Sequence, residues 1–248
     1  MAQTQMHKTT PFPDLWLPRQ VIREIDAVAV RELEIPSLLL MENAARGVCD
    51  RLLALLPEHQ KHAVNIVVLC GPGNNGGDGL CVARLLAANG LTPDVRLVTA
   101  GKPLSQDAAA NLKYLQNAGY PVTQGRTEDL VMRLSEAGSD DWIIDALLGT
   151  GMTGNPRREF AEVIDAANSS RASILAVDLP SGLDCDTGTA SGSCIRAKQT
   201  VTFVAQKSGF RNPAATEYTG EVQVCHIGIP LHWLQSWYDD LHRDSENR

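Results

Sequence analysis

The chain has 248 residues, of which 44% are hydrophobic and 21% charged, and its net charge is −7. These values are typical of one globular domain with a sizeable core, or of two small domains. The negative charge and the lack of a basic run disfavour a nucleic-acid partner, and no apolar stretch is long enough to cross a bilayer. The first 13 residues lack the apolar core of a signal peptide, and the six cysteines lack the spacing of a zinc site. We therefore expect a cytoplasmic protein with reduced cysteines and no membrane contact.

The N-terminal part is predicted to hold a flexible tail, residues 1–14, and then two helices. Between residues 18 and 34, apolar residues recur with a helical period. Pro36 interrupts this pattern, and Ser37 is a good N-cap for a second helix that runs to residue 56. Glu42 and Asn43 interrupt the apolar residues of that helix, which indicates either an exposed polar face or a supporting role near a site.

The most distinctive stretch runs from residue 64 to residue 88. Residues 64–70 are apolar and rich in β-branched side chains, as in a buried strand. Residues 71–79 contain five glycines and are predicted to form a loop, and residues 80–88 are predicted to form a helix. A strand, a glycine-rich loop and a helix can hold an anion at the helix N-terminus, because glycines let backbone N–H groups approach a ligand.

Two well-known loop motifs fit this stretch only in part. The first three glycines match G-x-G-x-x-G, but no carboxylate follows the next predicted strand, residues 95–99, to bind the ribose of a dinucleotide. A P-loop needs Lys and then Ser or Thr after the third glycine, where Gly77 and Asp78 stand. The side chains of Asn74, Asn75 and Asp78 instead suit hydroxyls, amides or a cation.

Helices and strands alternate along the rest of the chain. Helices are predicted at residues 105–118, 127–137 and 160–167, and strands near residue 122 and at residues 142–144, 172–177, 200–205 and 221–226. This alternation predicts a single three-layer α/β/α Rossmann-like domain with a mostly parallel, doubly wound sheet and extra N-terminal helices. We assign this domain to residues 15–238 and expect a charged C-terminal tail at residues 239–248 that frays.

Polar residues follow four of the predicted strands, after residues 70, 144, 177 and 205. In a parallel sheet these turns meet at the carboxyl edge, where open α/β folds bind ligands. Taken singly, an aspartate there could be a helix N-cap, a serine a turn residue and a lysine a solvated chain end. Their convergence from four strand ends favours a functional site. The side chains brought together are Asn74, Asn75, Asp78, Asp145, Asp178, Ser181 and Lys207.

The same turns carry four sequence motifs. They are NNGGDG at residues 74–79, DALLGTG at 145–151, VDLPSG at 177–182 and FVAQKSG at 203–209. In this order they resemble the NAD(P)H-hydrate epimerase family, that is, the YjeF N-terminal domain family, over about residues 18–235. Enzymes of this family interconvert the R and S forms of hydrated NADH and NADPH, damaged cofactors that carry a hydroxyl at C6 of the nicotinamide ring. A dehydratase then restores the S form, and we expect a separate dehydratase to act downstream of this chain.

The resemblance also implies roles for single residues. Asn75, Asp145 and Ser181 match the positions that bind potassium, one ion per subunit, and their oxygen atoms suit a hard cation. Asp178 matches the acid nearest the reaction, so we expect it to be the general acid–base. The substrate-binding positions implied are Asn74, Asn75, Gly76, Gly77, Asp78, Gly149, Thr150, Gly151, Met152, Thr153, Gly154, Asn155, Asp178 and, more weakly matched, Lys207.

Several alternatives stay open. The epimerisation could pass through an iminium-like ion or through a ring-opened aldehyde, and either hydrated NADH or hydrated NADPH could be preferred. The main alternative function is a non-catalytic nucleotide-ligand-binding or scaffold module on the same fold. An NAD-dependent dehydrogenase is disfavoured by the missing ribose carboxylate. A homodimer is expected from the family, through the apolar helices at residues 21–56.

Overall fold

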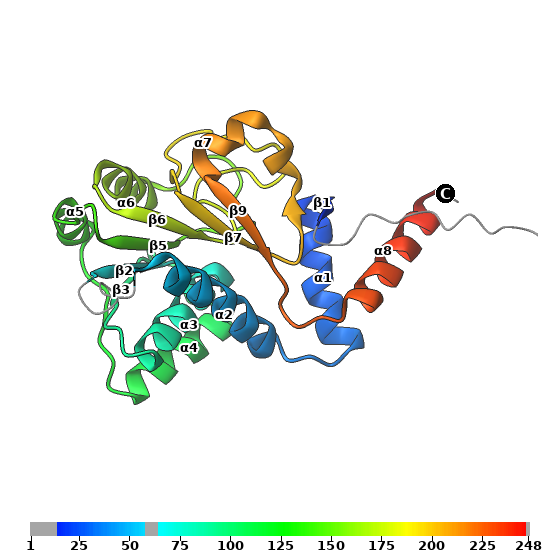
Figure 1. The fold of residues 1–248 in the computed structure, drawn as a ribbon, viewed down its shortest axis with the longest axis horizontal. Helices are drawn as coiled ribbons and strands as arrows, with labels where there is room; N and C mark the ends of the chain where they lie inside the picture. Colours follow the sequence, from blue (N-terminus) through cyan, green and yellow to red (C-terminus); the bar gives the residue numbers. More distant parts are fainter. Residues whose placement is uncertain (1–13, 58–63, 247–248) are drawn as a thin grey trace, which may run out of the picture.

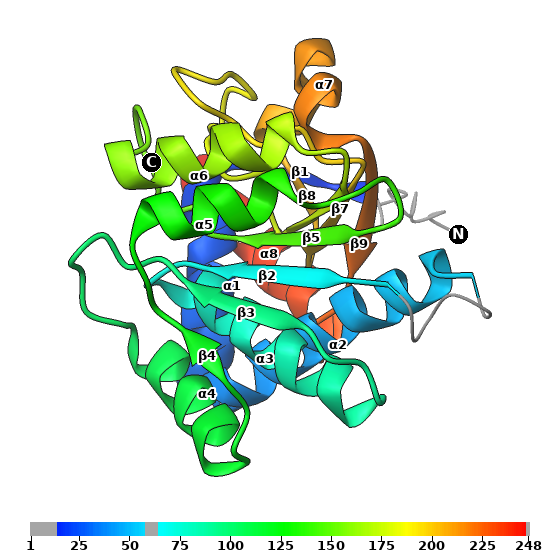
Figure 2. The same cartoon turned by 90° about the vertical axis from the view of Figure 1, so that its left-hand side faces the viewer.

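The computed structural model describes residues 14–57 and 64–246, which form three layers around a parallel sheet (Figures 1 and 2). Within these residues the sheet has seven strands in the order β4-β3-β2-β5-β6-β7-β9, and every neighbouring pair is parallel. The chain moves outward from β2 to one edge, returns to β5 and then moves to the other edge. The predicted doubly wound, Rossmann-like fold is therefore confirmed, with its switch point between β2 and β5.

The strands of the sheet are β2 (Ile66–Cys70), β3 (Asp94–Leu97), β4 (Val122–Thr123), β5 (Trp142–Ala146), β6 (Ser173–Val177), β7 (Gln199–Phe203) and β9 (Glu221–Cys225). The helices are α1 (Arg19–Glu32), α2 (Ser37–Leu55), α3 (Asn74–Ala88), α4 (Gln106–Asn117), α5 (Thr127–Ser135), α6 (Arg158–Ser169), α7 (Thr216–Thr219) and α8 (Leu231–Glu246). Two short strands, β1 (Trp16–Leu17) and β8 (Gln206–Lys207), pair with each other in parallel. Two 3₁₀ turns, η3 (Ser208–Arg211) and η4 (Pro213–Ala215), follow β8.

Alternate residues of the buried strands supply two separate cores. Val67 and Leu69 of β2 point into the core under α5 and α6, whereas Val68 and Cys70 point into the core under α2, α3 and α4. Figure 1 shows these two groups of helices on opposite faces of the sheet. The central strands are buried on both faces, which explains why their sequences are continuously apolar.

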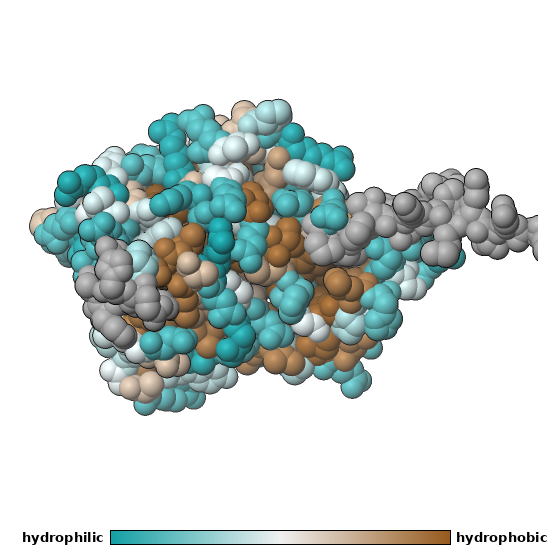
Figure 3. All heavy atoms as spheres, viewed as in Figure 1, coloured by the Kyte–Doolittle hydropathy of each residue, from teal (hydrophilic) through white to brown (hydrophobic). Residues whose placement is uncertain are grey.

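A third core joins the two ends of the described chain. Leu17, Ile25 and Leu234 pack together in it, so α1 and α8 lie side by side beyond the strand ends, as Figure 1 shows. In the space-filling view of Figure 3, hydrophobic residues gather over this region. None of the helices in the described parts of the chain is long and apolar enough to span a membrane.

Two local predictions are wrong. Ser37 is not the N-cap of α2 but its first helical residue, because the extended Pro36 takes the cap position and its carbonyl accepts the Leu39 N–H at 2.8 Å. The glycine-rich loop does not extend to residue 79, because α3 already begins at Asn74. The glycines at 76, 77 and 79 therefore lie inside a helix, where they permit close packing rather than a loop conformation.

The ends of the chain also differ from the sequence prediction. The helix α8 continues to Glu246, so most of the segment expected as a fraying tail, residues 239–248, is helical. Trp233, Leu234 and Trp237 anchor the first half of this helix in the third core. The N-terminal tail predicted at residues 1–14 falls, apart from Asp14, outside the described residues.

Candidate active site

A cleft of about 640 Å³ lies at the carboxyl edge of the sheet, and α1 forms one of its walls. The face of α1 that lines it carries Ile22, Asp26 and Val30, which are spaced by one helical turn. The opposite wall consists of the strand ends and the first turn of α3. The predicted site residues that line the cleft are Asn74, Asn75, Asp78, Gly149, Thr150, Gly151, Met152, Asp178 and Lys207.

The remaining predicted substrate-binding residues lie outside the cleft lining: Gly76, Gly77, Thr153, Gly154 and Asn155. A Cβ on Gly76 would stand 1.8 Å from the carbonyl oxygen of Gly71, and a Cβ on Gly77 would stand 2.8 Å from the terminal methyl group of Met41. Asn155 packs instead against Gly192, where an added Cβ would lie 3.2 Å from its Oδ1. The two glycines therefore let α3 pack closely against its neighbours, which places Asn74, Asn75 and Asp78 at the cleft.

The three predicted potassium ligands form one compact cluster. Ser181 donates its backbone N–H to Asp145 Oδ2 at 2.8 Å and its hydroxyl to Oδ1 at 2.6 Å. Leu148 donates its N–H to Ser181 Oγ at 2.8 Å, and its carbonyl oxygen accepts the Asn75 amide at 3.1 Å. Asp145 and Ser181 are fully buried, and they lie behind the wall that Asn75 and Leu148 present to the cleft.

Asp145 is an uncompensated buried carboxylate. Burial raises its pKa to about 6, although hydrogen bonds from Ser181 and Leu147 oppose this rise. No cation within the described residues pairs with Asp145, and no group of three or more His, Cys, Asp or Glu side chains there is placed to hold a metal. A single carboxylate surrounded by hydroxyl, amide and carbonyl oxygens fits a monovalent hard cation better than zinc or calcium.

Asp178 and Lys207, which both line the cleft, form an ion pair. Lys207 Nζ lies 2.7 Å from Asp178 Oδ1, and the Lys207 side chain is 0% exposed. The Thr202 hydroxyl and the Phe203 N–H also donate to Oδ1, at 3.3 and 3.2 Å. All the hydrogen bonds that this carboxylate receives from described residues therefore go to Oδ1. Oδ2 is left available to a ligand in the cleft.

The backbone at this point is strained. Asp178 has φ +65° and Val204 has φ +69°, in the left-handed region that β-branched residues rarely adopt. The Asp178 N–H donates to Val201 at 2.7 Å, and the Val204 N–H donates to Cys225 at 2.9 Å, so neighbouring strands hold both residues in place. Strain of this kind clusters at functional sites, where it fixes the direction of a side chain.

Two further carboxylates share the cleft. Burial, followed by the charges of Asp178, Asp26 and Asp107, raises the pKa of Asp78 well above its ordinary value. Although the cleft leaves Asp26 open to solvent, the surrounding protein and then Asp178 raise the pKa of Asp26 to about 6, and Lys207 opposes this rise. Sequence reasoning missed Asp26, and the available signal was its place one helical turn from both Ile22 and Val30, so that an acidic side chain interrupts an apolar stripe of the helix.

The rim of the cleft is positively charged. Arg23 and Lys102 both line it, and neither forms an ion pair within the described parts of the chain. Arg23 reaches the loop that follows β5, because its Nη2 lies 3.1 Å from where a Cβ on Gly151 would stand. The cleft therefore combines an acidic interior with cations at its entrance.

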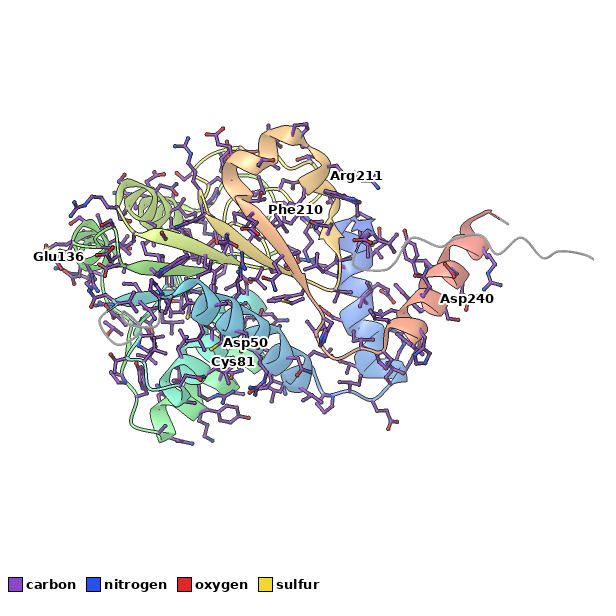
Figure 4. All side chains as sticks on the ribbon, in the orientation of Figure 1. Asp50, Cys81, Glu136, Phe210, Arg211 and Asp240 are labelled. Carbon is purple, nitrogen blue, oxygen red and sulfur yellow. The ribbon has the colours of Figure 1, made fainter. Side chains whose placement is uncertain are left out.

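The two polar residues inside α2 have supporting roles rather than forming a simple exposed face. Asn43 donates to the Ile227 carbonyl at 3.0 Å, and Ile227 lines the cleft. Glu42 pairs with Arg84 and accepts from Cys81 Sγ at 3.2 Å, which joins α2 to α3 (Cys81 is labelled in Figure 4). Both contacts hold the walls of the cleft together.

The chain is similar to proteins of one known family. A family model described as "YjeF-related protein N-terminus" matches residues 37–209. A protein of Rhodopirellula baltica named NAD(P)H-hydrate epimerase is 40% identical over 231 residues, covering 91% of this chain and 90% of that protein. A protein of the same name from Pirellula staleyi is 40% identical, covering 88% and 94%.

Two other similarities extend this result. A bifunctional NAD(P)H-hydrate repair enzyme Nnr of Salinibacter ruber is 39% identical over 214 residues, covering 83% of this chain and 39% of that protein. The crystal structure of yeast YNL200c has the same fold, with a TM-score of 0.69 and 23% identity, covering 86% of this chain and 87% of that one.

Proposed function

Because the chain belongs to the family of YjeF-related N-terminal domains, we propose that it is an isomerase that interconverts the R and S forms of hydrated NADH and NADPH. The observation that carries this proposal is Asp178, whose Oδ1 is tied to the buried Lys207 while Oδ2 is left for a ligand. A carboxylate held in this way can transfer a proton at a fixed point of the cleft.

The structure of the substrate explains how a single acid–base group can promote epimerisation. Its C6 bears a hydroxyl and is bonded to the ring nitrogen, so it is a hemiaminal carbon. When the hydroxyl is protonated, the nitrogen lone pair can expel water and leave a planar ion, and water that returns to the other face inverts the centre. Asp178 lies at the end of β6 in the wall of the cleft, where it can act on this carbon.

The rest of the cleft suits a dinucleotide with phosphate groups. The backbone of Gly149–Gly151 and the first turn of α3 offer N–H groups, and the helix end favours negative charge. Arg23 and Lys102 at the rim add positive charge. These groups counteract the repulsion that the acidic interior would exert on a phosphate.

The proposal includes one potassium ion held by Asn75, Asp145 and Ser181. The buried and unpaired Asp145 carboxylate and the surrounding oxygen atoms support such an ion. When bound, the ion offsets the charge of Asp145 behind the substrate-binding wall. It would also fix Asn75, which belongs both to this cluster and to the cleft lining.

The proposal extends to partners and location. Relatives that carry a second repair activity on the same chain support a dehydratase that acts on the product. A homodimer is supported by an exposed apolar residue of the N-terminal helices outside the cleft lining, Leu39, which is 50% exposed. A cytoplasmic location is supported by the six cysteines, all of which are free thiols.

A coupled assay tests the proposed function. A mixture of R and S hydrated NADH is given to an S-specific dehydratase, and the return of NADH absorbance is followed. The dehydratase alone stalls when the S form is used up, apart from slow spontaneous conversion. Addition of this protein is expected to consume the remaining R form quickly. A stall that persists with folded protein would show a binding or scaffold module instead.

A further inference from the structure

The proposed reaction needs proton transfer on both faces of the nicotinamide ring. One group must protonate the hydroxyl that leaves, and another must take a proton from the water that attacks the opposite face. Asp178 follows β6 and therefore stands on one wall of the cleft, from which it can act on one face of the ring only. A second group is required on the wall formed by α1.

Deepening the proposed function, on which this inference rests, we propose that Asp26 is a second catalytic proton-transfer residue that faces Asp178 across the cleft. Asp26 is the one acidic residue that α1 contributes to the cleft lining. Figure 1 shows α1 lying across the end of the sheet, and the cleft lining includes both Asp26 of α1 and Asp178 after β6, so a flat ring bound there would have α1 on one side and the end of β6 on the other. The side chain of Asp26 is exposed to the cleft and can reach a substrate.

The proton inventory balances over one turnover. Protonated Asp26 gives its proton to the C6 hydroxyl, the C–O bond breaks, and water leaves as the nitrogen lone pair forms the C=N bond. A second water then attacks C6 from the Asp178 face, a new C–O bond forms, and Asp178 takes the proton that this water loses. Asp26 is now ionised and Asp178 protonated, which is the state that performs the reverse reaction. Exchange with solvent resets the pair.

The charges around the two residues favour this division of work. Asp178 is paired with the Lys207 ammonium, which stabilises its negative charge. Asp26 has no ion-pair partner within the described residues, and desolvation by the surrounding cleft walls, followed by the charge of Asp178, raises its pKa to about 6, although Lys207 opposes this rise. Two carboxyl groups whose environments differ in this way are typical of a matched acid and base.

The pH dependence of the rate follows from the same groups. The charged and titratable groups that line the cleft with Asp26 are Arg23, Asp78, Lys102, Asp107, Asp178 and Lys207. In the active state, Asp26 and Asp178 together hold one proton. Ionisation of Asp26 removes this proton and leaves the pair inactive. We expect kcat to fall as the pH rises above about 6. The fall should be the same for conversion of R to S and of S to R, because the active states for the two directions hold the same number of protons.

The test compares Asp26→Asn with a matched control, Glu24→Gln. Glu24 lies on the same helix but outside the cleft lining, and it is exposed and only 3.7 Å from Arg31. The Asp26→Asn enzyme is expected to lose about 10²- to 10⁴-fold in kcat with little change in KM, and to lose the fall in rate above pH 6. The control should keep the wild-type kcat and pH profile. The Asp26→Glu enzyme should retain part of the wild-type kcat, and its kcat should still decrease at high pH.

The outcomes separate this inference from the proposed function. If the wild-type protein epimerises hydrated NADH but Asp26→Asn keeps kcat within about threefold and the same pH profile, Asp26 is not a catalytic residue. A change in KM alone would also overturn the inference, since it would indicate binding only. If the wild type is inactive, the proposed function itself fails. Should Asp26→Asn not fold, an Asp26→Glu enzyme with unchanged kcat and pH profile would overturn the inference.

Discussion

Replacing Lys207 with methionine tests the arrangement of the site through its stability. The ammonium lies 2.7 Å from Asp178 Oδ1 and is fully buried. At an effective dielectric constant of about 20, this distance corresponds to an attraction of about 6 kcal/mol. Desolvation of both groups offsets much of it, but removing one partner of a buried pair costs about 3–5 kcal/mol, because the other charge is left without its partner.

The expected loss lies at the lower end of that range. Asp178 would keep its hydrogen bonds from Thr202 and Phe203, and methionine fills most of the space of the lysine stem. We therefore expect Lys207→Met to lower the free energy of unfolding by about 3 kcal/mol. For a domain of this size, that is a fall of about 6–12 °C in Tm.

Thermal and urea unfolding measure this loss, with Lys198→Met as the control. Lys198 is exposed and lies 5.5 Å from the ring of Trp142, so its replacement should cost less than about 1 kcal/mol. The double variant Lys207→Met with Asp178→Asn should be more stable than the sum of the single variants predicts. Equal losses for Lys207→Met and the control, or strict additivity in the double variant, would refute the argument.

The remaining predictions concern catalysis, the ion and the packing of α3. Asp178→Asn should lower kcat by at least about 10²-fold, with hydrated NADH binding, measured by calorimetry, changing only a few-fold; full activity would remove Asp178 from the mechanism. Potassium at ten times its Kd should stabilise the wild type by about 1.4 kcal/mol relative to lithium at equal ionic strength, measured by thermal unfolding. If potassium raised the Tm of Asp145→Asn by the same amount, the proposed ion site would be wrong. Gly76→Ala should lower Tm because its Cβ would stand 1.8 Å from the Gly71 oxygen, whereas Gly73→Ala, with no atom within 4 Å, should not; a stable Gly76→Ala protein would contradict this packing.

The sequence predicted the sheet and most of its carboxyl edge because both depend on local patterns. Continuous apolar runs mark strands buried on both faces, and their alternation with helices implies parallel pairing. Once the strands are parallel, residues such as Asp145, Asp178 and Lys207 must come to one edge, although they lie far apart in the sequence. The convergence of these residues could therefore be predicted, but the ion pair between Asp178 and Lys207 was not.

Other features depend on tertiary packing and were not predicted. The start of α3 at Asn74 depends on glycines that pack against the backbone of Gly71 and the side chain of Met41, and a sequence with five glycines is typical of a loop. Asp26 joins the site only because α1 is packed across the strand ends, through residues such as Ile25. The tryptophans of α8, Trp233 and Trp237, are spaced by one helical turn, which is typical of a helix. The charged residues that follow them instead suggested a tail.

Direct analysis of a single epimer tests the central claim. Purified R-form hydrated NADH is incubated with this protein alone, and the two epimers are separated by chromatography over time. We expect the S form to appear at a rate proportional to the protein concentration until both forms reach equilibrium, with almost no conversion by Asp178→Asn. An S form that appears only at the spontaneous rate, in the presence of folded wild-type protein, would contradict the assignment of this cleft as an epimerase active site.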